Sequence, residues 1–332
     1  MINKLILEAI RQEIQRNQNF ILTTHVNPDG DGLGSQVALA RYLRSPAGGR
    51  KTVHLLNSSP VPPNYAFLDP NREIEVFDAT RHGDVVRDAQ VIFILDISDW
   101  ERLRELGKVA RTAPIRKVCV DHHPSEQPLG DIAVIHSEAS ATGELIYELL
   151  THLGAALDQK MAEALYTAIM TDTGSFRFSN TNPRAHEIVA RLIEAGAAPQ
   201  PIYQRVYESQ SREKVRLFAK ALDKLNFEAG GELAWFALPQ TLLRECGAQP
   251  RDTEGFADYP RSIDGVEVSL MFLETENGRV KVSFRSKGRH VINGLANRFG
   301  GGGHPYAAGA LMDGPLGKAI ASVLMETKEL FK

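Results

Sequence analysis

The chain has 332 residues, of which 43% are hydrophobic and 24% charged, and its formal net charge is −3. This length and composition predict a globular protein of two domains. The small net charge excludes the overall basic field of a protein that coats long nucleic acid. Two cysteines, Cys119 and Cys246, exclude a disulfide framework and suit a reducing compartment. We expect Cys119, inside an apolar run, to be a buried side chain rather than a nucleophile.

The first element that the sequence predicts is an amphipathic helix that begins near Ile2. Charged residues interrupt its apolar positions, which distinguishes it from a signal peptide. No apolar stretch of the sequence reaches the ~18 residues that span a bilayer. We therefore expect a cytoplasmic protein that has no contact with membranes.

Short apolar runs alternate with helical patterns through the rest of the first half. The runs at residues 20–25, 52–56, 91–95 and 118–120 are rich in β-branched residues, and a helical pattern covers about residues 32–43. Strands that alternate with helices predict an α/β fold with a doubly wound, mainly parallel sheet.

Three of these runs end in a residue that can bind a metal ion. His25 ends the first run, Asp96 follows residues 91–95, and Asp121 follows residues 118–120. Ligands of doubly wound sheets collect beyond the carboxyl ends of the strands. Polar residues often terminate strands, but three residues of this kind at three strand ends favour a shared site.

The turn after the first run carries a histidine and two carboxylates. His25, Asp29 and Asp31 lie within seven residues, together with Pro28 and Gly30. Gly30 would let the backbone bend tightly without a Cβ penalty. The alternative is an ordinary turn in which Asp31 caps the following helix.

Two more segments carry similar side chains. Asp121 is followed by His122 and His123, and because adjacent histidines seldom face one ion, we expect one to bind metal and the other to face substrate. Asp172 ends a later helical pattern and could be a further metal ligand. The alternative is that this segment only terminates the helix, at Gly174.

Carboxylates mixed with imidazoles suit Mn²⁺ or Mg²⁺, and the absence of thiolates from these segments disfavours a structural zinc site. Two such ions ~3.5–4 Å apart would activate a water molecule and stabilise charge during in-line displacement at phosphorus. The residues therefore indicate phosphoester hydrolysis.

The second half begins with helical patterns and ends with a smaller α/β domain. We predict helices at residues 143–153, 158–170, 183–195, 202–208 and 212–225. Strands follow at residues 232–238, 265–274 and 280–284, with a last helix at residues 316–330. We therefore expect domains at residues 1–208 and 215–332, joined by a linker at 209–214. The second domain would have a mixed sheet, and the active site would lie in the cleft between the domains.

A basic run in the second domain could bind phosphate. Residues 279–298 contain six lysines and arginines and no acidic residue. Alternation along a strand would place several of them on one face, although a solvated basic face is the usual explanation. Arg285 could grip a phosphate bidentately, and the glycine run at residues 300–303 would let backbone N–H groups approach it.

These motifs resemble a known family. The segments His25 to Asp31, Asp96, Asp121 to His123 and Thr171 to Gly174 resemble, in this order, the four motifs of the DHH phosphoesterases. Residues 299–309 resemble the GGGH motif of the DHH-associated C-terminal domain. The resemblance covers nearly the whole chain and is greatest to the nanoRNase and pAp phosphatase branch.

The resemblance implies two Mn²⁺ sites that share Asp96. One would be held by His25, Asp29 and Asp96, and the other by Asp31, Asp96, His122 and Asp172. His123 would contact the scissile phosphate, and Asp121 would orient a histidine. The substrate would be held by Arg285, Ser286, Gly302, Gly303 and His304.

We therefore predict an enzyme that uses two divalent cations, Mn²⁺ or alternatively Mg²⁺. It would hydrolyse short oligoribonucleotides to 5′-mononucleotides and dephosphorylate pAp at the 3′ position. A phosphodiesterase of linear or cyclic dinucleotides such as pApA or c-di-AMP is the nearest alternative. A pyrophosphatase or polyphosphatase and a non-catalytic nucleotide-binding module are further ones. We expect no long nucleic acid as partner and leave a homodimer open.

Overall fold

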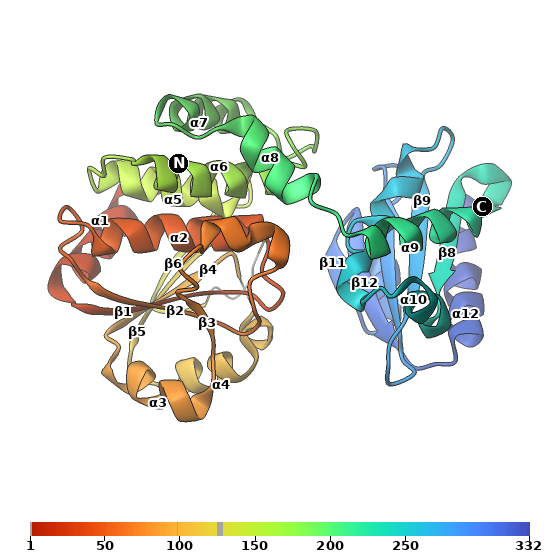
Figure 1. The fold of residues 1–332 in the computed structure, drawn as a ribbon, viewed down its shortest axis with the longest axis horizontal. Coiled ribbons are helices and arrows are strands. Elements are labelled where there is room, and N and C mark those ends of the chain that lie inside the picture. Colours follow the sequence, from red (N-terminus) through yellow and green to blue (C-terminus); the bar gives the residue numbers. More distant parts are fainter. Residues whose placement is uncertain (1, 98, 125–128) are drawn as a thin grey trace. The chain divides into compact units, whose positions relative to one another are not determined.

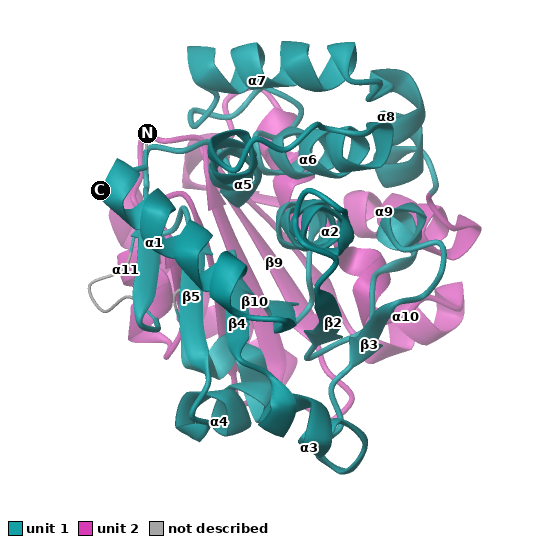
Figure 2. Ribbon diagram, turned by 90° about the vertical axis from the view of Figure 1, so that its left-hand side faces the viewer, with its two compact units in different colours: residues 1–209 teal, residues 210–332 magenta. Residues whose placement is uncertain are grey.

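The structure is a computed structural model that describes residues 2–97, 99–124 and 129–332. It divides into two compact units, Met1–Ser209 and Gln210–Lys332 (Figure 2). Within the described part of the chain, no helix combines the length and apolar character that a membrane span requires.

The first unit is built on a six-stranded sheet in which every neighbouring pair of strands runs parallel. The strand order is β3-β2-β1-β4-β5-β6. The strands are β1 (Asn19–Thr24), β2 (Thr52–Asn57), β3 (Ile74–Val76), β4 (Val91–Leu95), β5 (Arg116–Asp121) and β6 (Ile132–Ile135). The predicted doubly wound parallel sheet is confirmed.

Helices cover both faces of this sheet (Figure 1). One face packs against α1 (Lys4–Arg16), α2 (Gly30–Arg44), α5 (Thr142–His152) and α6 (Gln159–Asp172). The other packs against α3 (Ala79–Asp88) and α4 (Arg104–Thr112). Outside α6 lie α7 (Pro183–Glu194) and α8 (Pro199–Tyr207).

The central strands are apolar at successive positions because both of their faces are buried. In β1, Phe20 and Leu22 enter the core under α2, whereas Ile21 enters the core on the opposite face. Cys119 of β5 is fully buried in that second core. Burial, together with the charge of Asp121, raises the pKa of the Cys119 thiol to about 12. Cys119 is therefore a core side chain and not a nucleophile.

The strand order reverses between β1 and β4, which pair directly although two strands separate them in the sequence. The helices that follow these two strands leave on opposite faces of the sheet. Such a switch point opens a crevice beyond the carboxyl ends of the strands. Residues that follow β1 and β4 therefore lie at the place where this kind of sheet binds ligands.

Glycines let α2 pack closely against α6. A Cβ atom on Gly34 would lie 2.2 Å from the carbonyl oxygen of Ala164, and one on Gly30 would lie 2.4 Å from the Thr171 Oγ1 atom. Gly30 is the first residue of α2 and serves this close approach. The bend that the sequence analysis assigned to Gly30 is made by Asn27, whose φ of 54° lies in the left-handed region.

The second unit is smaller and contains a mixed six-stranded sheet of order β11-β12-β10-β9-β8-β7. Its strands are β7 (Asn226–Glu228), β8 (Leu233–Leu238), β9 (Val268–Glu274), β10 (Val280–Ser286), β11 (Gly302–His304) and β12 (Ala307–Met312). β8 and β9 run parallel, and the other pairs are antiparallel. The predicted mixed sheet is confirmed.

Helices also cover both faces of the second sheet. They are α9 (Arg212–Asp223), α10 (Gln240–Cys246), α11 (Asn293–Arg298) and α12 (Leu316–Lys328). The first two share a core with Phe236 and Leu238, and the last two pack on the opposite face. Ser211 caps α9 by accepting from the N–H of Lys214. The helix predicted at residues 212–225 thus begins where expected, and its first residues overlap the linker that we placed at 209–214.

The contact of Gly34 with α6 leads to a stability prediction. Replacement by alanine would force the two helices apart, and we expect Gly34→Ala to lower the free energy of unfolding by roughly 1–3 kcal/mol. Urea denaturation followed by circular dichroism measures this change.

Gly83 provides the matched control. It lies inside α3, and a Cβ atom there would meet nothing within 4 Å. Gly83→Ala should therefore raise the free energy of unfolding by roughly 0.5–1 kcal/mol through helix propensity. Equal effects of the two substitutions would contradict the assigned role of Gly34.

Candidate metal centre

Three strand ends meet at one edge of the parallel sheet. His25 follows β1, Asp96 follows β4, and Asp121 is the last residue of β5. These three strands are neighbours in the order β1-β4-β5, and all three side chains are buried. The structure thus brings together the three residues that the sequence placed at strand ends.

Asp96 is the residue on which the other side chains converge. Its φ of 61° lies in the left-handed region, which a residue with a Cβ atom adopts only at a cost of about 1–2 kcal/mol. The Asp96 N–H donates to the Val120 carbonyl over 2.9 Å, which fixes this backbone beside β5. Strain of this kind occurs mainly at functional positions.

One group of ligand atoms contains His25, Asp29 and Asp96, all within 4.8 Å of one another. The His25 Nε2 atom lies 3.5 Å from the Asp29 Oδ2 atom and 3.4 Å from the Asp96 Oδ2 atom. On the other side of the ring, Nδ1–H donates to the Val26 carbonyl over 2.9 Å. A carbonyl only accepts, so this bond fixes the tautomer and turns Nε2 toward the carboxylates.

The charge around His25 favours a cation. Burial lowers the pKa of His25, but hydrogen bonds and charge from Asp29 and Asp96 outweigh it and raise the pKa to about 10. The same environment that attracts a proton to Nε2 attracts a metal ion.

Asp29 has a second role as the cap of α2. Its Oδ1 atom accepts from the N–H groups of Asp31 and Gly32 over 3.0 and 3.1 Å. The capping residue is therefore Asp29 and not Asp31, the alternative considered from the sequence. One carboxylate oxygen of Asp29 orients the side chain, while the other faces His25.

Asp31 is held by a different helix. Its carboxylate accepts from the N–H groups of Thr142 and Gly143, over 2.6 and 2.8 Å, at the start of α5. This terminus lacks a side-chain cap of its own at Ala141, so Asp31 provides one. Burial and the nearby charge of Asp96 nevertheless raise the pKa of Asp31 well above its usual value.

A second group of ligand atoms contains Asp31, His122 and Asp172. The His122 Nε2 atom lies 3.8 Å from Asp31, 3.7 Å from Asp96 and 3.4 Å from Asp172. Its Nδ1–H donates to the Ala139 carbonyl over 3.3 Å. Nε2 is buried and has no hydrogen-bond partner among the described residues. A buried imidazole nitrogen that faces three carboxylates suits a metal ion.

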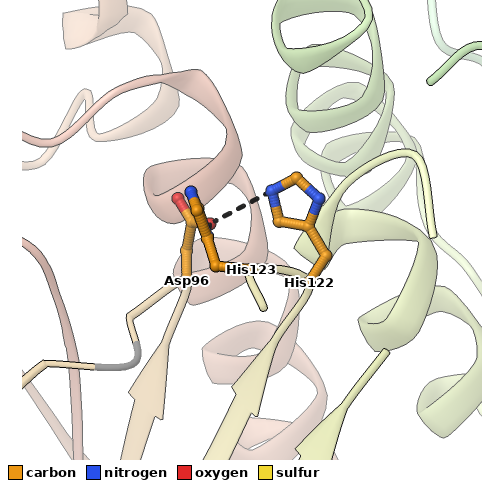
Figure 3. Close-up of side chains that lie close together, drawn as sticks. All are labelled: Asp96, His122 and His123. Atoms are coloured by element: carbon orange, nitrogen blue, oxygen red, sulfur yellow. Dashed lines mark ion pairs between the residues drawn. The ribbon is translucent and has the colours of Figure 1, made fainter. Parts of the chain in front are cut away.

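The two adjacent histidines both approach Asp96 (Figure 3). Their rings meet edge to face, with centroids 4.6 Å apart. The His123 Nδ1–H donates to the Asp121 Oδ1 atom over 2.7 Å, and the His123 backbone N–H donates to the same oxygen. Burial lowers the pKa of His123, but Asp121 and Asp96 raise it overall. Asp121 thus orients His123.

The carboxylates of the site repel one another. Burial raises the pKa of Asp172 well above its usual value, and the charges of Asp96 and Asp29 raise it further. The four aspartates at positions 29, 31, 96 and 172 carry four negative charges when ionised, which two divalent cations would neutralise. The donor set of carboxylate oxygens and imidazole nitrogens fits Mn²⁺ or Mg²⁺.

Two residues of the site were missed by the sequence analysis. The Thr142 hydroxyl donates to the Asp96 Oδ1 atom over 3.2 Å, and the Asn180 amide donates to the Asp172 Oδ2 atom over 3.3 Å. Thr142 could have been noticed because it precedes a glycine at the start of a predicted helix. Asn180 lies in a loop, where the sequence offers no comparable signal.

The arginines of the basic run in the second unit are paired with acidic residues, which the sequence of the run alone does not show. Arg285 donates from Nε to the Asp258 Oδ1 atom over 3.1 Å and from Nη1 to the Phe284 carbonyl. The other arginines of the run, at positions 279, 289 and 298, also form ion pairs with acidic residues. Acidic residues outside the basic run thus offset much of the positive charge of that run. Ser286, another predicted substrate residue, is buried.

The last two glycines of the run belong to the sheet, whereas Gly300 lies in the turn after α11. Gly302, Gly303 and His304 form the edge strand β11, and the chain reverses at residues 305–306 before β12. Gly303 has a φ of 140°, and a Cβ atom there would lie 2.6 Å from the Ala307 carbonyl oxygen. Gly303 is therefore required for the close approach of β11 to β12.

Comparisons with known proteins match both units. The DHH family, N-terminal domain, matches residues 19–169, and the DHHA1 domain matches residues 239–332. The chain is 31% identical to the bifunctional oligoribonuclease and PAP phosphatase NrnA of Bacillus subtilis, over 91% of this chain and 92% of that protein. It is 30% identical to the NrnA of Thermus thermophilus, over 93% and 89%.

A solved structure extends the likeness to the whole fold. The crystal structure of an exopolyphosphatase-related protein from Bacteroides fragilis has a TM-score of 0.93 and 28% identity, and covers 100% of this chain and 98% of that chain. From these matches and the ordered motifs, the chain belongs to the DHH family and carries a DHHA1 domain in its second unit.

Proposed function

We propose that this chain is a two-metal phosphoesterase that hydrolyses short oligoribonucleotides to 5′-mononucleotides and removes the 3′-phosphate of pAp. The observation that carries the proposal is the buried carboxylate of Asp96, which faces His25 through one oxygen and His122 through the other. Relatives named oligoribonuclease and PAP phosphatase support phosphoester hydrolysis as the activity.

The side chains divide into two ligand sets around Asp96. His25, Asp29 and Asp96 would hold one divalent cation, and Asp31, Asp96, His122 and Asp172 would hold the other. Mn²⁺ is our choice because these sets mix imidazole with carboxylate, and Mg²⁺ would also suit the oxygens. When bound, such a pair of ions lowers the pKa of water and stabilises charge at phosphorus.

The surrounding residues of the first unit hold the ligands and the substrate. Asp121 orients His123, which would contact the scissile phosphate. Carbonyl groups of Val26 and Ala139 hold the His25 and His122 rings, and α5 holds Asp31 through its first N–H groups. Preorganisation of this kind reduces the rearrangement needed during the reaction.

Residues of the second unit would bind a part of the substrate remote from the reacting phosphate. We propose Arg285, Ser286, Gly302, Gly303 and His304 for this role. Arg285 is now engaged with Asp258, so a substrate phosphate would have to compete with or join that carboxylate. These residues can contact only a few phosphates, so they suit oligonucleotides of a few residues rather than long chains.

Polyphosphate and pyrophosphate are the second candidate substrates, because the Bacteroides fragilis structure of the same fold is described as exopolyphosphatase-related. Hydrolysis of a dinucleotide such as pApA would use the same two ligand sets. A non-catalytic binding module would have no need for two complete sets of ligands around a strained aspartate.

Loss of Asp96 tests the shared carboxylate. We expect Asp96→Ala to lower kcat for pAp by at least about 10³-fold, since both ligand sets lose an oxygen. Asp84→Ala removes a carboxylate whose side chain is 82% exposed on α3, so it should retain wild-type activity. Substantial activity of the Asp96 variant at saturating Mn²⁺ would refute a shared role.

Substrate choice is tested by one panel measured at fixed Mn²⁺. The panel contains pAp, pApA, a five-nucleotide RNA, long single-stranded DNA, pyrophosphate and polyphosphate. We expect the highest kcat/KM values for pAp and the short RNA. Fastest turnover of long DNA or of polyphosphate would contradict the proposed substrate class.

A further inference from the structure

The loop at residues 173–182 carries two phenylalanines with opposite environments. It starts directly after Asp172, the ligand-set residue at the end of α6, and leads to α7. Phe176 is partly buried in the core, whereas Phe178 is 48% exposed. The function described above uses neither ring.

The backbone of this loop is tied closely to Asp172. The N–H groups of Arg177 and Phe178 both donate to the Thr173 carbonyl, over 2.9 and 3.0 Å. The Asn180 amide donates to both the backbone carbonyl and the side chain of Asp172. The loop therefore folds back onto this metal-ligand candidate. Phe178 lies between Thr173 and Asn180, the two residues that form these hydrogen bonds.

Phe176 anchors the loop on its inner side. Its ring meets Tyr166 of α6 edge to face, with centroids 6.2 Å apart, and lies 5.4 Å from the ring of His186 on α7. Ser175 and Phe176 have φ values of 60° and 66°, in the left-handed region. Consecutive residues adopt this conformation only where the surroundings impose it. The loop is thus held in one shape, and exposure of Phe178 is part of that shape.

Gly174 supports the ring of Phe178. A Cβ atom on Gly174 would lie 2.4–2.6 Å from ring atoms of Phe178, so the ring lies directly on the glycine backbone. The rest of the ring remains accessible. An apolar ring that rests on a glycine backbone and is exposed in the loop that follows Asp172 is available for stacking.

We propose that Phe178 stacks on the nucleobase of the nucleotide whose phosphate lies at the Asp172 ligand set. This inference rests on the proposed function, because it takes the substrate to be a nucleotide. A phenyl ring has no hydrogen-bonding group, so it would bind any base through its π face and would favour the larger purines. The site would thereby accept different bases but bind sugar phosphates without a base more weakly.

Binding of two ligands, a product nucleotide and its analogue without a base, separates the contribution of the base from that of the phosphate. AMP and ribose 5-phosphate share the phosphate and the sugar, and only AMP has a base. Their dissociation constants are measured by isothermal titration calorimetry on the full chain with Mn²⁺ present. Neither ligand requires turnover, so the readout is independent of catalytic rate.

Phe178→Leu should weaken AMP binding roughly 5- to 100-fold, the usual range for loss of one stacked base, and leave ribose 5-phosphate unchanged. Leucine retains an apolar cover over Gly174 but lacks a π face. Phe178→Tyr should bind both ligands as the wild type does. The matched control is Phe227→Leu, at a phenylalanine that is 51% exposed on β7 and should change neither constant.

Unchanged AMP binding in Phe178→Leu would overturn the proposal, and so would equal weakening of both ligands, which would show that the ring only supports the loop. Absence of phosphoester hydrolysis in the wild type would instead refute the proposed function. The ratio of the two dissociation constants would still decide whether Phe178 contacts a base.

Discussion

Repulsion among closely spaced carboxylates is the constraint on which this structure depends. Two negative charges about 4–5 Å apart near a protein surface repel by about 3–4 kcal/mol, while a whole domain is stable by only about 5–15 kcal/mol. The fold nevertheless places Asp29, Asp31, Asp96 and Asp172 around two histidines. Part of the repulsion is relieved without metal, because the pKa values of Asp31 and Asp172 are raised and that of His25 is about 10. Bound cations would relieve the remaining repulsion. Until they bind, hydrogen bonds with the surrounding backbone hold the ligand side chains in place.

The parallel sheet and most of the cluster could be predicted because both depend on local patterns. Strand ends place His25, Asp96 and Asp121 at one edge once the strands are known to be parallel. The strand order, and with it the switch point between β1 and β4, comes only from the structure. The close approach of Asp31 to Asp172 depends on more than pattern. It requires α2 to pack on α6 through Gly30 and Gly34, which the sequence does not reveal as contact points.

The rest escaped prediction because it involves partners distant in the sequence. Asp31 binds the start of α5, 111 residues away, and the acidic partners of the arginines come from outside the basic run. A basic run read in isolation therefore overstates the positive charge. That Gly302 and Gly303 belong to a strand follows only from the pairing of β11 with β12. The structure also distinguishes the environments of Phe176 and Phe178, which look equivalent in the sequence.

The most direct test of the central claim is the number of metal ions that the cluster binds. Equilibrium dialysis against Mn²⁺, with the protein-bound metal quantified by elemental analysis, should approach two ions per chain at saturation. Asp96→Asn keeps the size of the side chain and removes its charge, so it should weaken both sites. A saturating value of one ion or none in the wild type would contradict the two-metal site, and unchanged binding in the variant would contradict the shared role of Asp96.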